Sequence, residues 1–374
     1  MRSALVAALL FTACGGSGGN ATANHSPAAS TSPSAAASGS SAGTPSGSLP
    51  SPKPVTGAYA VLVGSAGTSS YSVSIIDIKG KVVVSAEATT PVQPTCGTTA
   101  AAVLPAPVST SNSRLYFMDA AGTVRYLAPD GATGTATTVP AGTAARRSMF
   151  AVSPDDRRIA VIIEDFTSAG ATTRLYVEDL GGGNRTTTFS QTGTTGLWPT
   201  GWHGTNNLIV AKVPACTQGG GPFCCGPTEF HVIDPVNFTR RFTIGSPTCL
   251  IAGAPTAAGV ACERVPNGYA NIETWTATYS MGGLAVPSPI PAHVSPNGRR
   301  LAVVVDAGHT SVYSLDSGWS TSQLALAACG WVDDTHLLAG GTAQSQPRIA
   351  DVSTGVMVPV AAVGDCGGGI PGGL

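Results

Sequence analysis

Two short motifs, each occurring twice, constrain the fold of this chain more than any other feature of the sequence. The first, V-S-P-[DN]-x-R-R-[IL]-A-V, lies in residues 151–163 and 293–305, and the second, G-W-x5-L, lies in residues 201–211 and 330–340. A Pro-Asp or Pro-Asn pair followed by a short apolar run is typical of a tight turn that enters a buried strand. The interleaving of two such motifs predicts a repeat architecture built from β-strands.

The spacing of the apolar strands identifies the repeat unit. The residues that open the second strand of each repeat recur at intervals of 36 to 54 residues: Val61, Leu115, Ile159, Leu208, Val260, Leu301 and Leu337. Such periods are typical of four-stranded propeller blades. We therefore predict an all-β fold in which residues 57–374 form a β-propeller of seven four-stranded blades, with six or eight as alternatives. The first blade lacks an inner strand, which either residues 53–56 or the tail after Val363 would supply.

The element S-P-[DN]-[DG]-R-R-[IL]-A resembles the SPDG-type repeats of TolB-like and WD40-like β-propellers. It is clear in two blades and degenerate in five. Pro154 and Pro296 preset φ for the turn, so these residues are interpreted as hairpin chemistry and not as catalytic groups. Trp202 and Trp331 occupy equal positions in two blades, which predicts packing between blades.

The N-terminal residues form a second motif. Arg2 precedes the apolar residues 4–11, which are followed by Thr12, Ala13 and Cys14. Eight apolar residues are too few to span a bilayer, for which about 20 are needed. The segment resembles the lipobox of bacterial lipoproteins, which implies a signal peptide over residues 1–13, a lipid on Cys14 and attachment to the extracytoplasmic face of the cell membrane.

Residues 14–56 are predicted to be a disordered linker. Between Gly15 and Pro54 the sequence is rich in Gly, Ser, Ala and Pro, with no Val, Ile or aromatic residue. Such a segment cannot build a core, and ~40 residues of it reach on the order of 35 Å as a coil. The expected organisation is therefore an anchor, a tether and a propeller.

Charge is sparse in this chain and gives no sign of nucleic-acid binding. Only 10% of residues are charged, the formal net charge is −1, and no cluster of Lys and Arg exceeds a pair. A nucleic-acid-binding surface requires a basic stripe or patch. We expect a monomer that binds no nucleic acid and touches the membrane through the lipid on Cys14.

The cysteines predict disulfides and not a metal site. Removing Cys14 from the nine leaves eight, an even number, and an exported compartment permits bridges. The eight are Cys96, Cys216, Cys224, Cys225, Cys249, Cys262, Cys329 and Cys366.

Connectivity stays open at this stage. Cys249 and Cys262 flank Pro255-Thr256 symmetrically, so a hairpin there would pair them. Cys216 pairs with Cys224 or Cys225 in one scheme, in which Cys96 bonds Cys366 across the ring closure. Cys329 then takes the remaining vicinal cysteine, or Cys366. No Cys-x2-Cys or His-x3-His spacing occurs, so we expect no metal and no cofactor.

The loops that leave the second and fourth strands of each blade gather at one mouth of the axis, which is the expected binding face. The side chains expected there for binding are Phe166, Phe223, Arg264, Tyr269 and Asp306. Candidates for acid or base chemistry at the same mouth are His309, Glu164, Asp165 and Glu263. Glu164 and Asp165 are paired carboxylates at a strand end, where such acids are usually solvated, and His309 has no evident partner in the sequence, which favours an exposed loop histidine.

Two functional hypotheses follow. The first is a membrane-anchored module that binds an envelope protein, a polymer or a small ligand, and the second is a propeller-type lyase or hydrolase with its site at the axial mouth. The absence of a recognisable catalytic set favours the binding module, so an enzyme is the less expected class. Fold resemblance does not choose between them, because propellers host unrelated functions.

Overall fold

The computed structural model describes residues 49–65, 69–96, 100–217, 227–264, 269–275, 280–285, 291–314, 321–342 and 344–374. The predicted signal peptide, Cys14 and most of the predicted linker lie outside these residues, as do Phe223, Cys224 and Cys225. In the described part every regular element is a strand, and no helix there has the length and apolarity to cross a membrane.

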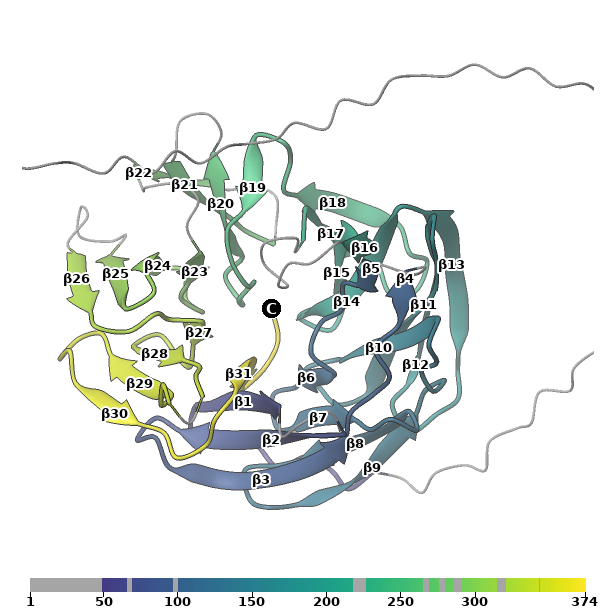
Figure 1. Ribbon diagram of the computed structural model, residues 1–374, viewed down its shortest axis with the longest axis horizontal. Coiled ribbons are helices and arrows are strands. Elements are labelled where there is room, and N and C mark those ends of the chain that lie inside the picture. The colour runs from purple at the N-terminus through teal and green to yellow at the C-terminus, as the bar shows by residue number, and fades with distance from the viewer. Residues whose placement is uncertain are drawn as a thin grey trace, which may run out of the picture. The chain divides into compact units, whose positions relative to one another are not determined.

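Seven antiparallel four-stranded sheets are arranged around one axis, with the first strand of each sheet nearest the centre (Figure 1). From the axis outward, blade 1 contains β31 (Asp365–Ile370), β1 (Tyr59–Ser65), β2 (Ser70–Asp77) and β3 (Val82–Thr89). Blade 2 contains β6 (Val108–Thr110), β7 (Leu115–Met118), β8 (Thr123–Leu127) and β9 (Thr133–Thr138). Blade 3 contains β10 (Arg146–Val152), β11 (Arg158–Thr167), β12 (Gly170–Asp179) and β13 (Thr186–Gly193).

The remaining blades follow the same order. Blade 4 contains β14 (Thr195–His203), β15 (Asn207–Pro214), β17 (Glu229–Ile233) and β18 (Arg240–Ile244). Blade 5 contains β19 (Cys249–Ile251), β20 (Val260–Arg264), β21 (Tyr269–Glu273) and β22 (Ser280–Ala285). Blade 6 contains β23 (Ala292–Val294), β24 (Arg300–Asp306), β25 (His309–Ser314) and β26 (Thr321–Leu324), and blade 7 contains β27 (Gly330–Trp331), β28 (His336–Ala339), β29 (Arg348–Asp351) and β30 (Met357–Pro359).

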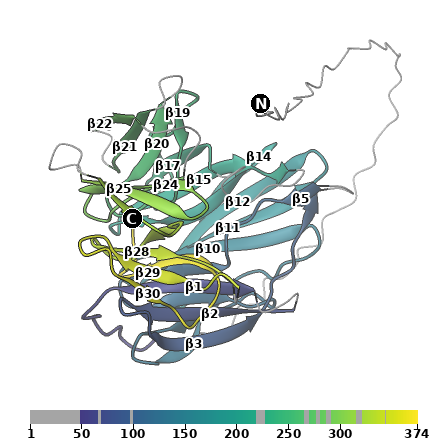
Figure 2. The ribbon, with the colours of Figure 1, turned by 60° about the vertical axis from the view of Figure 1, so that its left-hand side comes forward.

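The prediction of a seven-bladed propeller is therefore confirmed. All seven residues that the spacing placed at second strands lie in the second strand of a blade. The inner strand of blade 1 comes from the tail, because β31 pairs with β1 with Leu62 opposite Cys366. Figures 1 and 2 show blade 7 beside blade 1 at this closure.

Residues 49–56, which the composition assigned to the linker, pack against the propeller. The side chain of Leu49 contacts the core of blades 2 and 3, and that of Val55 contacts the core of blades 1 and 2. The guanidinium of Arg114 donates to the carbonyl of Pro50, and Lys53 pairs with Asp130 at 2.9 Å. Contacts with the propeller thus begin before residue 57, because a few apolar side chains suffice to dock a Pro-rich segment.

The two repeated motifs contact each other between neighbouring blades. In blade 3 the V-S-P motif forms the turn between β10 and β11, where the hydroxyl of Ser153 accepts the N–H of Arg158 at 2.9 Å. The indole of Trp202, from the G-W motif of blade 4, donates to the carbonyl of Ala151 at 3.1 Å. The guanidinium of Arg158 lies 4.9 Å from the Trp202 ring and donates to the carbonyl of Thr205.

The same contacts join blades 6 and 7, and we call the hydrogen bonds of the Trp indole and the Arg guanidinium to carbonyls of the neighbouring blade a latch. The indole of Trp331 donates to the carbonyl of His293 at 2.8 Å, and Arg300 donates to the carbonyl of Asp334. The expected role of the two tryptophans, packing between blades, is confirmed. The two motifs alternate along the sequence because the V-S-P motif of one blade contacts the G-W motif of the next blade.

Replacing Trp202 by Phe is expected to destabilise the fold by about 2 kcal/mol or more, because the fully buried indole loses volume and its hydrogen bond to the carbonyl of Ala151. The matched control is Tyr176→Phe, which removes a buried hydroxyl that has no partner among the described residues. Its unfolding free energy should stay the same or rise. Urea denaturation of both variants checks this, and equal losses for the two would contradict the proposed latch.

Candidate functional site

A small extra sheet covers part of one end of the propeller. It contains β4 (Thr95–Cys96) and β5 (Ala100–Ala102), from the connection between blades 1 and 2, and β16 (Cys216–Thr217), from the connection between β15 and β17. A disulfide joins Cys96 to Cys216, and the N–H of Val103 donates to the carbonyl of Ala215 at 3.3 Å. The connection from blade 1 therefore crosses to blade 4 on the face where the binding loops were expected.

The disulfides correct two of the expected pairings. Cys96 bonds neither Cys366 nor any other tail residue, because its loop reaches Cys216 in blade 4. For the same reason Cys216 does not close its own insertion through Cys224 or Cys225. Cys366 bonds Cys329, one of the alternatives left open, and this bridge joins the inner strand of blade 1 to blade 7.

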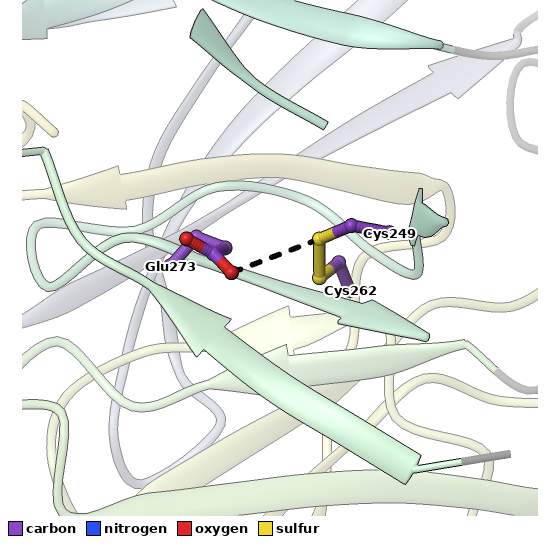
Figure 3. A group of neighbouring side chains, drawn as sticks. All are labelled: Cys249, Cys262 and Glu273. Atoms are coloured by element: carbon purple, nitrogen blue, oxygen red, sulfur yellow. Dashed lines mark hydrogen bonds between the residues drawn. A yellow bond between two sulfur atoms is a disulfide. The ribbon is translucent and has the colours of Figure 1, made fainter. Parts of the chain in front are cut away.

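Cys249 and Cys262 are bonded, as the hairpin predicted. Figure 3 shows Glu273 beside this bridge, with one carboxylate oxygen 3.8 Å from the Cys249 sulfur. The two sulfurs and a carboxylate oxygen of Glu273, which could in principle bind a metal ion, lie within 4.8 Å of one another. The sulfurs are bonded to each other, however, and zinc binds thiolates. In the disulfide form this cluster is a structural bridge.

The four candidates for acid or base chemistry do not converge. Glu164 is buried on β11 of blade 3, and Asp165 forms ion pairs with Arg146 and Arg174. Glu263 lies on β20 of blade 5. His309 lies in the hairpin of blade 6, and no side-chain hydrogen bond or ion pair among the described residues joins any of the four to another.

His309 does have a positioned partner, contrary to the expectation from the sequence. Its Nδ1 lies 2.9 Å from both carboxylate oxygens of Asp306, three residues earlier in the β24–β25 hairpin. Both side chains are exposed. The N–H of Gly308, and then the imidazole, lower the pKa of Asp306. The pair lies in open solvent at a hairpin tip, without the enclosed pocket that a catalytic site uses.

The residues expected at the binding face are also differently placed. Phe166 is 4% exposed, because the extra sheet covers it together with Ala171 and Ala215. Arg264 is held in an ion pair with Glu273 at 3.0 Å. The side chain of Tyr269 lies outside the described part of the chain, and Asp306 is the exposed partner of His309.

Glu164 is a buried carboxyl group with one unpaired oxygen and a raised pKa. It is fully buried between blades 3 and 4, where its Oε1 accepts the N–H of Leu197 at 2.6 Å and the hydroxyl of Thr173 at 3.1 Å. Its Oε2 has no partner among the described residues. Burial raises the pKa of Glu164 to about 7, against the two donors, which lower it.

A groove with a volume of about 400 Å³ lies between blades 3 and 4. This size lies within the range of small-molecule sites, ~300–1,000 Å³. Its apolar wall consists of Leu175, Phe189, Leu197, Val210, Ile233 and Phe238. Its polar side consists of Gln191, Thr195, Lys212, His231 and Arg240. We call this the blade 3–4 groove.

Three of the polar groove residues, Lys212, His231 and Arg240, form a row across blade 4 that includes the neighbouring carboxylate of Glu229. The carboxylate of Glu229 accepts from Lys212 at 3.0 Å and from the Nε2 of His231 at 2.9 Å. The guanidinium of Arg240 lies 3.4 Å from that same Nε2. Burial lowers the pKa of His231, so its ring is neutral at pH 7, and the hydrogen bond from His231 lowers the pKa of Glu229.

One groove residue has a strained backbone. Phe238 adopts φ of 59°, in the left-handed region that disfavours large side chains. It lies in a turn where its N–H donates to the carbonyl of Asp234 at 2.8 Å. In the equivalent turn of blade 7 the N–H of Gly355 donates to the carbonyl of Asp351 at 2.8 Å, with φ of 72°. A phenylalanine therefore stands where the same turn elsewhere has glycine, at a cost on the order of 1 kcal/mol.

The sequence reasoning missed this groove. Its residues come from two blades and from strands that appear only as ordinary alternating patterns. One signal was available: the segment D-P-V-N-F-T at 234–239 has Phe where D-V-S-T-G-V at 351–356 has Gly. Aligning the turns between third and fourth strands would have singled out Phe238.

Comparison with known proteins assigns this chain to no family. No family model and no curated protein matches the sequence. Among solved structures, an oligogalacturonate lyase in complex with manganese is 11% identical, with 75% of this chain and 81% of that chain covered and a TM-score of 0.49. The β-propeller domain of Myceliophteria thermophila Cps50 (Swd1) is also 11% identical, with 69% and 86% covered and a TM-score of 0.43. The class that fold and site define is a seven-bladed β-propeller with a groove between two blades.

The buried carboxyl of Glu164 predicts a pH dependence of stability. Its pKa is about 7 in the folded state against an ordinary 4.5, so its contribution is complete below pH 4.5 and is lost as the pH rises through 7. Over this window the wild type should lose about 3 kcal/mol relative to Glu164→Gln, which cannot ionise. Chemical denaturation of both proteins at several pH values measures the difference. A difference that does not change with pH would show that Glu164 is not a neutral buried acid.

Proposed function

We propose that this chain is an exported lipoprotein whose propeller is a ligand-binding module, and that the blade 3–4 groove is its ligand site. The observation that carries the site is Phe238, whose ring lines the groove from a position that the same turn in blade 7 fills with glycine. Strained residues persist where the surrounding structure or a function requires them. An apolar wall with a few placed polar groups is the usual composition of a small-molecule site.

The anchor and the orientation form the second part of the proposal. The lipobox-like motif ending at Cys14 supports a lipid anchor, and the Gly- and Ser-rich segment after it supports a tether. Residues 50–56 dock beside the turns that follow the first and third strands of blade 2. In an antiparallel blade those turns lie at the end opposite to the connections that carry the extra sheet. The chain thus enters the propeller at the end opposite to the extra sheet.

The groove can be tested with an uncharged apolar probe. N-phenylnaphthylamine, which fluoresces in apolar surroundings, is expected to bind the native protein at one site. Phe238→Gly should weaken binding about tenfold, because it removes the ring. The same change should leave the free energy of unfolding within about 1 kcal/mol of the wild type, because relief of the left-handed strain offsets the lost packing.

The control for that experiment is Gly355→Ala, which alters the matching turn of blade 7 and should destabilise the protein by about 1 kcal/mol without changing probe binding. Saturable binding that Phe238→Gly does not affect would place the ligand elsewhere. No binding by the wild type would remove the groove as a ligand site.

The anchor can be tested by intact-mass analysis of the protein from its native membrane fraction. The expected mass is that of a chain that begins at Cys14 and carries acyl groups, and Cys14→Ser should abolish both the acyl mass and sedimentation with membranes. An unacylated wild-type chain recovered from the medium would contradict the anchor. It would leave the groove proposal intact and make a freely diffusing enzyme the next hypothesis to test.

A further inference from the structure

The polar row of the blade 3–4 groove contains a solvent-exposed cation, Arg240, that is paired with no carboxylate of the described residues. The carboxylate of Glu229 only accepts hydrogen bonds, so the Nε2 of His231, 2.9 Å away, must carry the proton between them. That nitrogen then has no lone pair for Arg240, although the guanidinium lies 3.4 Å from it. Arg240 therefore lies beside the row, but no atom of the row accepts a hydrogen bond from its guanidinium.

No other acceptor compensates Arg240 within the described residues. The carboxylates nearby are occupied: Glu229 holds Lys212 and His231, and Asp234 holds the neighbouring Arg241 at 2.8 Å. Lys212 and Arg240 together carry two positive charges, against one negative charge on Glu229. With His231 neutral at pH 7, the groove keeps one positive charge in excess beside an apolar wall.

We infer that the blade 3–4 groove binds amphipathic monoanions, in which an apolar ring system or chain lies along the wall and a single carboxylate or sulfonate pairs with Arg240. The inference rests on the proposed function, since it specifies the ligand of the same groove. A guanidinium is suited to this role because its fork of N–H donors matches the two oxygens of such a group. Phe238 lies in the turn before β18, and Arg240 is the first residue of that strand. One short segment therefore supplies both the apolar and the ionic contact.

The test compares two probes that differ only in charge. Anilinonaphthalene sulfonate has the skeleton of N-phenylnaphthylamine plus one sulfonate. At neutral pH and low salt the sulfonate should bind the wild type about tenfold more tightly. Arg240→Gln should bring the two affinities together while leaving that of the uncharged probe unchanged, and Arg240→Lys should restore part of the difference. Phe238→Gly should weaken both.

Arg348→Gln is the control for net charge, because it removes one cation from an exposed position on β29 of blade 7. It should leave the ratio of the two affinities as in the wild type. Decanoate should displace the sulfonate probe more effectively than decanol does, which separates recognition of the anion from recognition of the aromatic rings.

Two results would overturn the inference while leaving the groove in place. One is equal affinity of the wild type for both probes, and the other is a preference for the sulfonate that survives Arg240→Gln. Failure of the uncharged probe to bind would instead overturn the proposed function itself, and the inference with it.

Discussion

The pairing of β31 with β1 is the interaction on which the rest of the ring depends. Each blade packs against its two neighbours, so a propeller has no central core that could hold an open ring together. Here the tail supplies the inner strand of the first blade, and the Cys329–Cys366 bridge joins that strand to blade 7. Beyond β31 the N–H of Gly372 donates to Ser111 in blade 2, and that of Leu374 donates to Trp202 in blade 4. The tail thereby connects four blades, and Figure 1 shows it ending at the centre of the ring.

The position of the groove follows from the geometry of a radial array. Neighbouring blades are closest near the axis, where the latch between Trp202 and Ala151 joins blades 3 and 4. Toward the rim the sheets diverge, and larger side chains must fill the space. Between β13 and β18 the filling is incomplete, which leaves an apolar wall open to solvent. The charged row on blade 4 makes one side of this opening polar, and the strained turn places the ring of Phe238 on its apolar wall.

The sequence predicted the features that depend on local patterns. Repeated turns and apolar runs identified seven blades and their second strands, and the symmetric positions of Cys249 and Cys262 identified one disulfide. The extra sheet was not predictable, because its strands have two or three residues each and β16 pairs with β5 across more than a hundred positions. The closing strand remained one of two alternatives, since a Gly-rich segment such as residues 365–370 has little strand propensity of its own.

The candidate site was less predictable than the fold, for a physical reason. Glu164 was expected to be a solvated acid at a strand end, yet the packing of blade 4 against blade 3 buries it. His309 looked isolated, yet a hairpin places Asp306 against it. The groove residues become neighbours only when two blades pack, and the lack of an acceptor for Arg240 depends on which atom of His231 carries the proton. Apart from the pairing of Asp306 with His309, which are three residues apart, these properties are not encoded in a short window of sequence.

The central claim is that Phe238 holds a left-handed backbone conformation in order to line a ligand groove. A crystal structure of the protein with N-phenylnaphthylamine tests both halves at once. We predict a positive φ at Phe238 and electron density for the probe against its ring, between β13 and β18. A relaxed backbone at Phe238 with the groove filled by protein side chains, or probe density only at another surface, would contradict it.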